Sequence, residues 1–247
     1  MADDDHVDIE LRSAATVAER CVILAALIRR LWIESSFALE NAEDWADEAF
    51  DLREWLRTEA IWTSLTALEA DILQRPVGGV SEDDLALYTW QAEGLATLGW
   101  AIRLTDLLPP GDEGEISAVV QAVPAPWDST AAWMRGAQLR SEAEIAIERD
   151  RAEIYEWRIA LESPRRFATG QEQVDYMAAI RDVVREAGAT GLLDRKAGTD
   201  FSIGDRPLPE FDATSLERLA ALAEVRLRAL NWLCGFGSSW DEVPIDI

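Results

Sequence analysis

The helical pattern that decides the fold is clearest in residues 14–33, which read AATVAERCVILAALIRRLWI. Apolar side chains recur in this stretch at alternating spacings of four and three residues: Val17, Cys21, Leu24, Ile28 and Leu31. Side chains at these spacings share one face of an α-helix, so the stretch predicts a long amphipathic helix. Thr16 with Glu19, and later Ser141 with Glu144, predict capping boxes at helix starts.

The same period extends outward along the chain and predicts further helices. The longer ones cover residues 45–56, 81–104, 141–164, 171–187 and 214–234. Residues 199–208 differ, because a glycine-containing turn lies there between two short extended stretches, which predicts a small β-hairpin. We therefore expect an all-α fold, a bundle-like single domain over residues 11–247 that follows a flexible acidic N-terminus at residues 1–10.

The charge of the chain is strongly unbalanced. It has 47 acidic and 23 basic residues, which gives a formal net charge of −24, and the first ten residues supply only five of the acids. Such a field repels nucleic acid and anionic membrane surfaces, and it accelerates encounter with a basic protein at low salt. The arginines lie among acids and form no basic stripe, so we expect no nucleic-acid partner. The simpler interpretation of the charge is solubility alone.

Cysteine usage and hydropathy indicate the compartment. The two cysteines, Cys21 and Cys234, each lie in an apolar helical stretch, as buried thiols of a reducing compartment do. The acidic start lacks the basic segment of a secretory signal. The apolar run at residues 21–28 ends at two arginines and is too short to span a membrane. We expect a soluble cytoplasmic protein with no membrane partner.

Several short blocks resemble a known bacterial family. They are residues 89–95 (TWQAEGL), 99–101 (GWA), 107–110 (LLPP), 139–141 (LRS), 229–233 (ALNWL) and 240–244 (WDEVP). Through these blocks, over roughly residues 81–247, the chain resembles domain-of-unknown-function family 4272, whereas the first 80 residues match it only in general helical character. The resemblance implies a helical fold but no activity.

The chain departs from the family pattern at four polar positions. Gln91 stands where the resemblance implies an arginine, Glu156 where it implies a histidine, and Ile245 and Ile247 where it implies threonines. Family chemistry that depends on those polar groups is not expected here.

Common catalytic motifs are absent from the sequence. His6 is the only histidine, and it lies in the acidic N-terminus, which argues against a Ser/His/Asp triad, a common zinc site or a histidine-containing di-iron site. No phosphate-binding or dinucleotide-binding glycine motif opens a helix. The sequence therefore favours a protein that is not an enzyme and needs no cofactor.

Paired carboxylates offer the strongest catalytic alternative. Acids stand three residues apart on two successive predicted helices: Glu153, Glu156, Glu172 and Asp175. Two such helices packed together would hold magnesium, in a layout similar to the all-α nucleotide pyrophosphohydrolases, and would hydrolyse a nucleotide or another phosphate. The competing interpretation is a solvated face that pairs with the interleaved arginines.

The chain is rich in tryptophan, with eleven residues. Six lie on or beside apolar faces, and most of these we expect in the core: Trp32, Trp62, Trp90, Trp100, Trp157 and Trp232. Four others stand among acids or prolines and are expected to be exposed: Trp45, Trp55, Trp127 and Trp133. Of these, Trp45 and Trp55 with their neighbouring acids are the predicted partner surface, because tryptophan is enriched at binding hot spots.

The C-terminal tail has two interpretations. In the first it is a latch, with Trp240 and Val243 packed on the final helix. Asp241 or Asp246 would accept a hydrogen bond from Asn231 or from a nearby arginine such as Arg226 or Arg228. In the second it covers a small-ligand pocket. The pocket would be formed by Trp90, Glu93, Asn231, Trp232, Trp240 and Asp241.

These observations favour one function over two alternatives. The favoured one is a non-enzymatic cytoplasmic bacterial protein, of the immunity or antitoxin kind, whose acidic surface covers a basic protein partner. The alternatives are the magnesium-dependent hydrolase and the small-ligand pocket. The sequence leaves the oligomeric state open, including a homo-oligomer.

Overall fold

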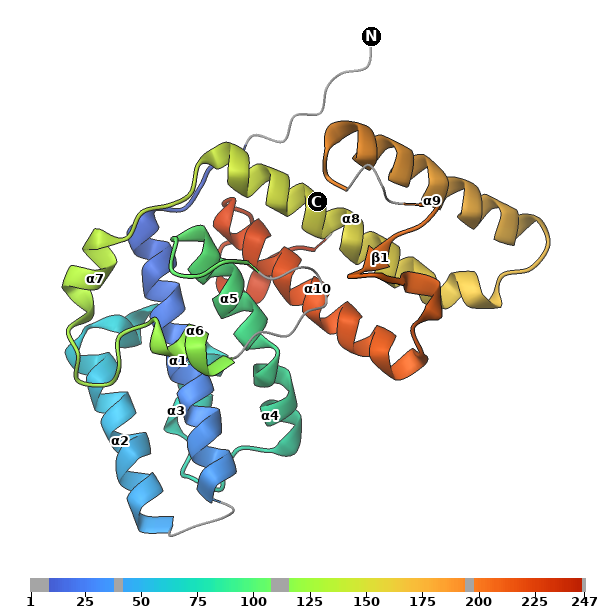
Figure 1. Cartoon of the computed structure of the whole chain (residues 1–247). Coiled ribbons are helices and arrows are strands. Elements are labelled where there is room, and N and C mark those ends of the chain that lie inside the picture. Colours follow the sequence, from blue (N-terminus) through green and yellow to red (C-terminus); the bar gives the residue numbers. More distant parts are fainter. Residues whose placement is uncertain (1–8, 38–41, 108–115, 194–197, 246–247) are drawn as a thin grey trace.

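The structure is a computed structural model that describes residues 9–37, 42–107, 116–193 and 198–245 (Figure 1). These residues form ten α-helices, three short 3-10 helices and one two-stranded hairpin, which confirms the all-α class with a small hairpin. The α-helices are α1 (Ala14–Phe37), α2 (Ala42–Thr58), α3 (Ala67–Gln74), α4 (Glu82–Thr89), α5 (Gln91–Ala101), α6 (Ile116–Gln121), α7 (Thr130–Gly136), α8 (Glu142–Phe167), α9 (Gln171–Thr190) and α10 (Ala213–Leu233). The other elements are η1 (Ile61–Ser64), β1 (Ser202–Ile203), β2 (Arg206–Pro207), η2 (Leu208–Glu210) and η3 (Trp240–Glu242). His6, Asp246 and Ile247 lie outside the described residues, as does most of the predicted N-terminal segment.

Helix α1 is the centre of the larger core. Its side chains are buried around most of its circumference, whereas the sequence pattern predicted an amphipathic helix with one buried face. Helices α2, α3, α4, α5 and α7 all contact it (Figure 1). The capping box predicted for Thr16 and Glu19 at its start is wrong. The hydroxyl of Ser13 accepts a hydrogen bond from the Thr16 amide at 3.2 Å. Glu19 instead accepts a hydrogen bond from the Ser64 hydroxyl at 2.7 Å.

The predicted helix over residues 81–104 is divided into α4 and α5. Trp90 separates the two but keeps right-handed helical dihedral angles, so the chain bends there without leaving the helical region. Helix α5 ends at Ala101, earlier than predicted. Arg103 adopts a left-handed conformation with φ of 65°, and the Leu104 amide turns back to the Gly99 carbonyl at 2.8 Å.

Helices α8, α9 and α10 form an arm that extends from the α1 core (Figure 1). Helix α8 begins at the predicted capping box of Ser141 and Glu144 and packs along α10. It was expected to end near Pro164 but continues to Phe167. The hairpin is antiparallel, with Ser202 opposite Pro207. Two small apolar clusters hold the arm, one between α8 and α9 and one under the hairpin.

Ion pairs explain why α8 continues past its proline. Burial alone would raise the pKa of Glu162, but hydrogen bonds from Arg165, Arg166 and Arg158 outweigh burial and hold this pKa at about 2. Two of these arginines lie beyond Pro164 on the same helix, so their bonds to Glu162 span the proline. Arg158 also donates to Asp200, which ties the hairpin segment to α8. The sequence predicts an end near Pro164 because proline disfavours a helix interior, and it does not reveal the ion pairs that span this proline.

Within the described ranges, no helix is long and apolar enough to cross a membrane.

Candidate functional site

Helix α2 presents an acidic face whose carboxylates have no partner among the residues that the structure describes. Asp44, Asp47, Glu48 and Asp51 follow the spacing of one helix face, and all four are exposed. No hydrogen bond or ion pair joins any of them to another residue that the structure describes. We call these four residues the acidic face.

A groove of about 470 Å³ lies directly beside the acidic face. Residues from α1, α2 and the loop before α7 line it, among them Trp32, Trp45, Trp127, Glu48 and Asp51. Trp32 and Trp127 are 40% and 56% exposed. We call this depression the tryptophan groove. Its apolar lining and acidic rim are the mixture that binding sites use for affinity and orientation.

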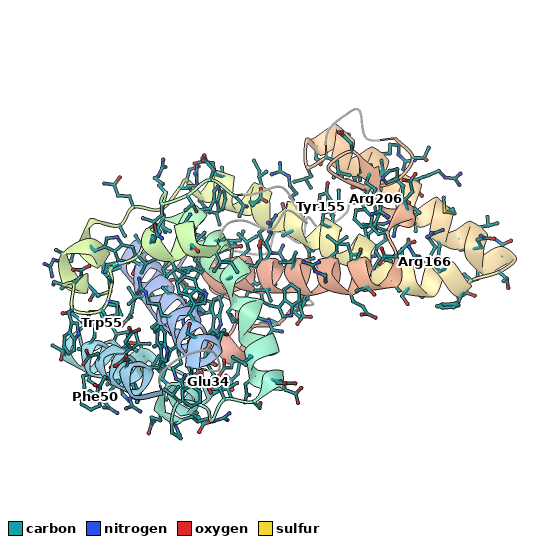
Figure 2. All side chains as sticks on the ribbon, turned by 60° about the horizontal axis from the view of Figure 1, so that its bottom comes forward. Glu34, Phe50, Trp55, Tyr155, Arg166 and Arg206 are labelled. Carbon is teal, nitrogen blue, oxygen red and sulfur yellow. The ribbon has the colours of Figure 1, made fainter. Side chains whose placement is uncertain are left out.

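Trp55 lies beneath this region and not at the surface. It is only 1% exposed, so the prediction that it forms part of a partner surface is wrong. Its indole nitrogen donates to the Asp128 carbonyl at 2.9 Å, and this bond fixes the loop before α7. Figure 2 shows Trp55 at the end of the molecule that also carries Phe50, far from Arg166 and Arg206 of the arm. The apolar period of α2, and not its acidic neighbours, decides the position of Trp55.

Burial of the other tryptophans also differs from expectation. All eleven are described, and only three are buried: Trp55, Trp232 and Trp240. Trp127 is exposed as predicted, while Trp45 and Trp133 are half-buried. Trp32 was expected near the core and is instead exposed in the groove. Helical spacing places a residue near an apolar face but does not determine whether a neighbouring helix covers it.

The loop that carries Trp127 is held by Arg29 as well as by the indole of Trp55. Arg29 of α1 donates to the carbonyls of Pro124, Val120 and Val123 at 2.8 to 3.1 Å. Burial lowers the pKa of Arg29, and the neighbouring Asp128 raises it in part. These charge-assisted hydrogen bonds hold the Arg29 guanidinium against the loop backbone.

Trp127 occupies a backbone position that usually requires glycine. The Asp128 amide donates to the Ala125 carbonyl at 3.0 Å, which closes a four-residue turn. Proline fixes φ of Pro126 near −65°, and Trp127 has φ of 73°, the combination of a type II turn. Glycine or asparagine normally stands at this third position, and a bulky residue there costs about 1–2 kcal/mol.

The tail forms a latch on α10 and α5. Trp240 contacts Trp232 edge to face, with ring centroids 5.4 Å apart, and Val243 is buried behind it. The Trp240 indole donates to Gln91 Oε1 at 3.3 Å. Gln91 is the position at which the resemblance implies an arginine, and arginine has no acceptor for this bond. Gln91 therefore suits the packing of Trp240 in this chain.

Asn231 is satisfied within the latch. Its Nδ2 donates to the Pro244 carbonyl at 3.0 Å, and its Oδ1 accepts from Arg149 Nε at 3.0 Å. The expectation that Asp241 accepts from it is wrong, because the tail turns so that a backbone carbonyl reaches the amide first. The other expected acceptor, Asp246, lies outside the described residues.

A second groove, of about 530 Å³, runs between the latch and the start of α1. Of the six residues predicted for a pocket under the tail, Trp232, Trp240 and Asp241 line it. The other three are Trp90, Glu93 and Asn231, which do not. Glu93 is buried and pairs with Arg226 at 2.6 Å, so the contact between α5 and α10 uses its charge. We call this second depression the tail groove.

The four predicted magnesium ligands do not form one cluster. Only residues 168–170 separate α8 from α9, so Glu172 and Asp175 lie near the C-terminal end of α8. Glu156 lies eleven residues before that end, about 16 Å along the axis. Glu153 pairs with Arg149 at 3.1 Å. Across the described part of the chain, no group of three or more His, Cys, Asp or Glu side chains is placed to hold a metal ion.

Both cysteines are free and buried, as their apolar surroundings predict. Burial raises the pKa of Cys21 to about 12 and that of Cys234 to about 11. Arg20 beside Cys21 and Arg149 beside Cys234 offset only part of the effect. Because the thiolate is the nucleophile, neither cysteine has the surroundings of a reactive one.

Comparisons with known proteins identify one family. A family model described as "Domain of unknown function (DUF4272)" matches residues 3–174. The match includes helix α1, the acidic face and the tryptophan groove, so it covers the first 80 residues as well as residues 81–174 of the range predicted from short blocks. It does not extend to the tail. Searches of curated proteins and of solved structures gave no match.

Proposed function

This chain belongs to the family described as a domain of unknown function, DUF4272, and we propose that it is a non-enzymatic interaction module that binds a basic protein. The observation that carries the proposal is the acidic face of α2. Four neighbouring carboxylates that pair with none of the described residues repel one another, so holding them together is unfavourable unless they serve solubility or a cationic partner.

The pairing of charges elsewhere in the molecule supports the acidic face as the surface that binds the partner. Buried arginines are matched to acids, as in Arg20 with Glu69 and Arg226 with Glu93. Others donate to backbone carbonyls, as Arg29 does. Much of the positive charge is therefore used inside the fold, while the acidic face remains available. A field of this sign accelerates encounter with a basic surface and discriminates against acidic ones.

The finer form of the proposal concerns the setting. We propose a cytoplasmic bacterial protein of the immunity or antitoxin kind, which covers the basic surface of an effector. The excess of 24 negative charges supports this form, because a basic effector and an acidic inhibitor associate rapidly at low salt.

The test is selection of peptides from a random displayed library on the immobilised protein, followed by association-rate measurements. We expect selected peptides rich in arginine and lysine, with association rates that fall as salt rises. A variant that neutralises the acidic face carries Asp44→Asn, Asp47→Asn, Glu48→Gln and Asp51→Asn. It should associate about tenfold more slowly at low salt, with a flatter salt dependence.

The matched control changes the same charge at the other end of the molecule. It carries Glu172→Gln, Asp175→Asn, Asp182→Asn and Glu186→Gln, all exposed on α9. Its association rate should stay close to that of the unmodified protein. Equal slowing in both variants would show that net charge acts without a specific face. Selected peptides without positive charge would contradict the proposal as a whole.

The tail groove favours a second candidate function, binding of a small polar molecule. The support is its size together with Arg20, a buried arginine on its wall whose Nε has no hydrogen-bond partner in the described part of the chain. Thermal unfolding with a panel of nucleotides, sugars and amino acids would test it, because a ligand of the native state raises the unfolding temperature. The rise should disappear in Asp241→Asn or Thr16→Val, which alter the lining. No rise with any compound would exclude those classes.

A further inference from the structure

Resting on the proposed function, we infer that the tryptophan groove receives one arginine side chain of the basic partner. The groove adjoins the acidic face, and Glu48 and Asp51 belong to both. The inference concerns what fills the groove, whereas the proposed function concerns the charge of the surface around it.

Folding alone does not explain the exposed indoles. Trp32 and Trp127 leave 40% and 56% of their surfaces in water, so they contribute only part of the stabilisation that a buried indole gives. Trp127 also sits at a turn position that disfavours any side chain with a Cβ. Residues that break a local backbone rule and point to solvent are concentrated at binding sites.

The Trp127 loop is fixed before any ligand arrives. Arg29 holds it from α1, the Trp55 indole holds it from α2, and Glu59 accepts from both the amide and the hydroxyl of Thr130 at 2.8 Å. A loop braced in this way loses little conformational freedom on binding. Such preorganisation is typical of a recognition surface.

The charge of the lining selects a cation. Glu48 and Asp51 are exposed at the groove and have no partner among the described residues. Arg29 is the one basic residue of the lining, and its Nη1 and Nη2 donate to backbone carbonyls of the loop. An incoming cation therefore meets two carboxylates and the π systems of several indoles, both of which attract positive charge.

Arginine fits these surroundings better than lysine. Its guanidinium is planar, stacks on aromatic faces and donates in a fork that matches carboxylate oxygens. It is also less strongly hydrated than an ammonium group, so entering an apolar groove costs less. A volume of about 470 Å³ holds one such side chain with its neighbouring backbone.

The experiment compares three synthetic peptides on the full-length protein at low salt. Each has the form acetyl-Lys-Lys-Gly-X-Gly-Lys-Lys-amide, with X as arginine, lysine or citrulline, an uncharged analogue of arginine. We expect the arginine peptide to bind about tenfold more tightly than the citrulline peptide, with the lysine peptide between them. In Trp127→Ala the preference for arginine should fall to about twofold or less.

Phe167→Ala is the matched control, since this side chain is 84% exposed on α8, away from the groove. It should keep the full preference for arginine. Thermal unfolding of both variants checks that each is folded, and Trp32→Ala provides a second groove variant if one is not. Peptides that bind equally well, yet more weakly to the neutralised acidic face, would overturn the arginine inference and leave the proposed function intact. Absence of binding by all three at low salt would contradict both.

Discussion

Two regions of this molecule concentrate tryptophan, and they use it in opposite ways. In the latch, Trp232 and Trp240 are buried against each other, and Arg12 and Arg20 lie over their faces at 4.6 and 5.2 Å. In the tryptophan groove, the indole of Trp127 is largely in water. The same side chain therefore closes the fold at one place and remains available at the other.

The difference lies in whether the indole surface is already occupied. Both latch indoles have an aromatic neighbour and a cation in place, supplied by the chain itself. The groove holds carboxylates and indoles, and among the described residues its one arginine, Arg29, lies over the buried Trp55 and not over the exposed rings. The latch thus shows, within this fold, the tryptophan–arginine contact that we propose for the groove with an arginine from a partner. The comparison predicts different losses of stability on substitution.

The largest expected effect follows from removing a latch indole. Trp240→Ala should lower the free energy of unfolding by about 3–5 kcal/mol, because a buried tryptophan leaves a cavity and its hydrogen bond to Gln91 is lost. Trp127→Ala should cost less than about 1 kcal/mol, since that indole is mostly solvated. Urea unfolding monitored by circular dichroism measures both. Similar losses in the two variants would remove the distinction between the regions.

A smaller effect is expected where the N-terminal segment holds the latch. Arg12 donates to the carbonyls of Trp232 and Gly237 at 2.7 Å each, so it joins the start of the chain to its end. Burial lowers the pKa of Arg12, which shows that its charge is partly removed from water. Arg12→Ala should lower the free energy of unfolding by roughly 1–3 kcal/mol.

Arg185→Ala provides the control for Arg12. Its side chain is 75% exposed and pairs with Asp182 on the surface of α9. Exposed pairs of this kind contribute about 0–1 kcal/mol, so the loss should be clearly smaller. If Arg12→Ala were equally harmless, the contacts of Trp232 and Trp240 alone would hold the tail, and the role of the N-terminal segment in the latch would be refuted.

The contact between the N-terminal segment and the latch also requires a glycine in the backbone. Gly235 has φ of 91°, and a Cβ there would lie 2.5 Å from the Glu10 carbonyl oxygen. A glycine directly after an apolar helical run, as here, is typical of a helix C-cap. Local spacing gives no sign that Glu10 passes over this glycine, since that contact joins residues more than 200 positions apart in the sequence.

Local patterns predicted what local interactions decide. The long helix of residues 14–33, the capping box at Ser141 and the hairpin near residues 199–208 all depend on neighbours within a few positions. The patterns failed where a distant partner decides. The apolar period of α2 turns Trp55 inward, but its burial also needs the loop before α7, which is 73 residues away at Asp128. The continuation of α8 past Pro164 is a different case, because the ion pairs of Glu162 are local, with partners three and four residues away on the same helix.

The candidate site was predictable only in part, for the same reason. Trp45 and the acids of α2 were visible as a surface because they share one helix. Trp32 and Trp127 come from α1 and from the loop before α7, so only the folded chain brings them to the same groove. One local signal was available. In the turn Pro126-Trp127, tryptophan stands where glycine is usual, so the backbone conformation of Trp127 is unfavourable for its side chain.

That signal gives the smallest and most specific prediction. Trp127→Gly and Trp127→Ala remove the same indole, but only glycine adopts φ of 73° without a Cβ in the way. Glycine also gains more freedom in the unfolded chain, which offsets part of the relief. We expect the glycine variant to be more stable than the alanine variant by up to about 1 kcal/mol, as measured by urea unfolding. Both variants should lose the preference for arginine peptides to the same extent. If alanine proved the more stable of the two, Trp127 would not be strained, and its exposure alone would have to explain why the chain keeps an indole there.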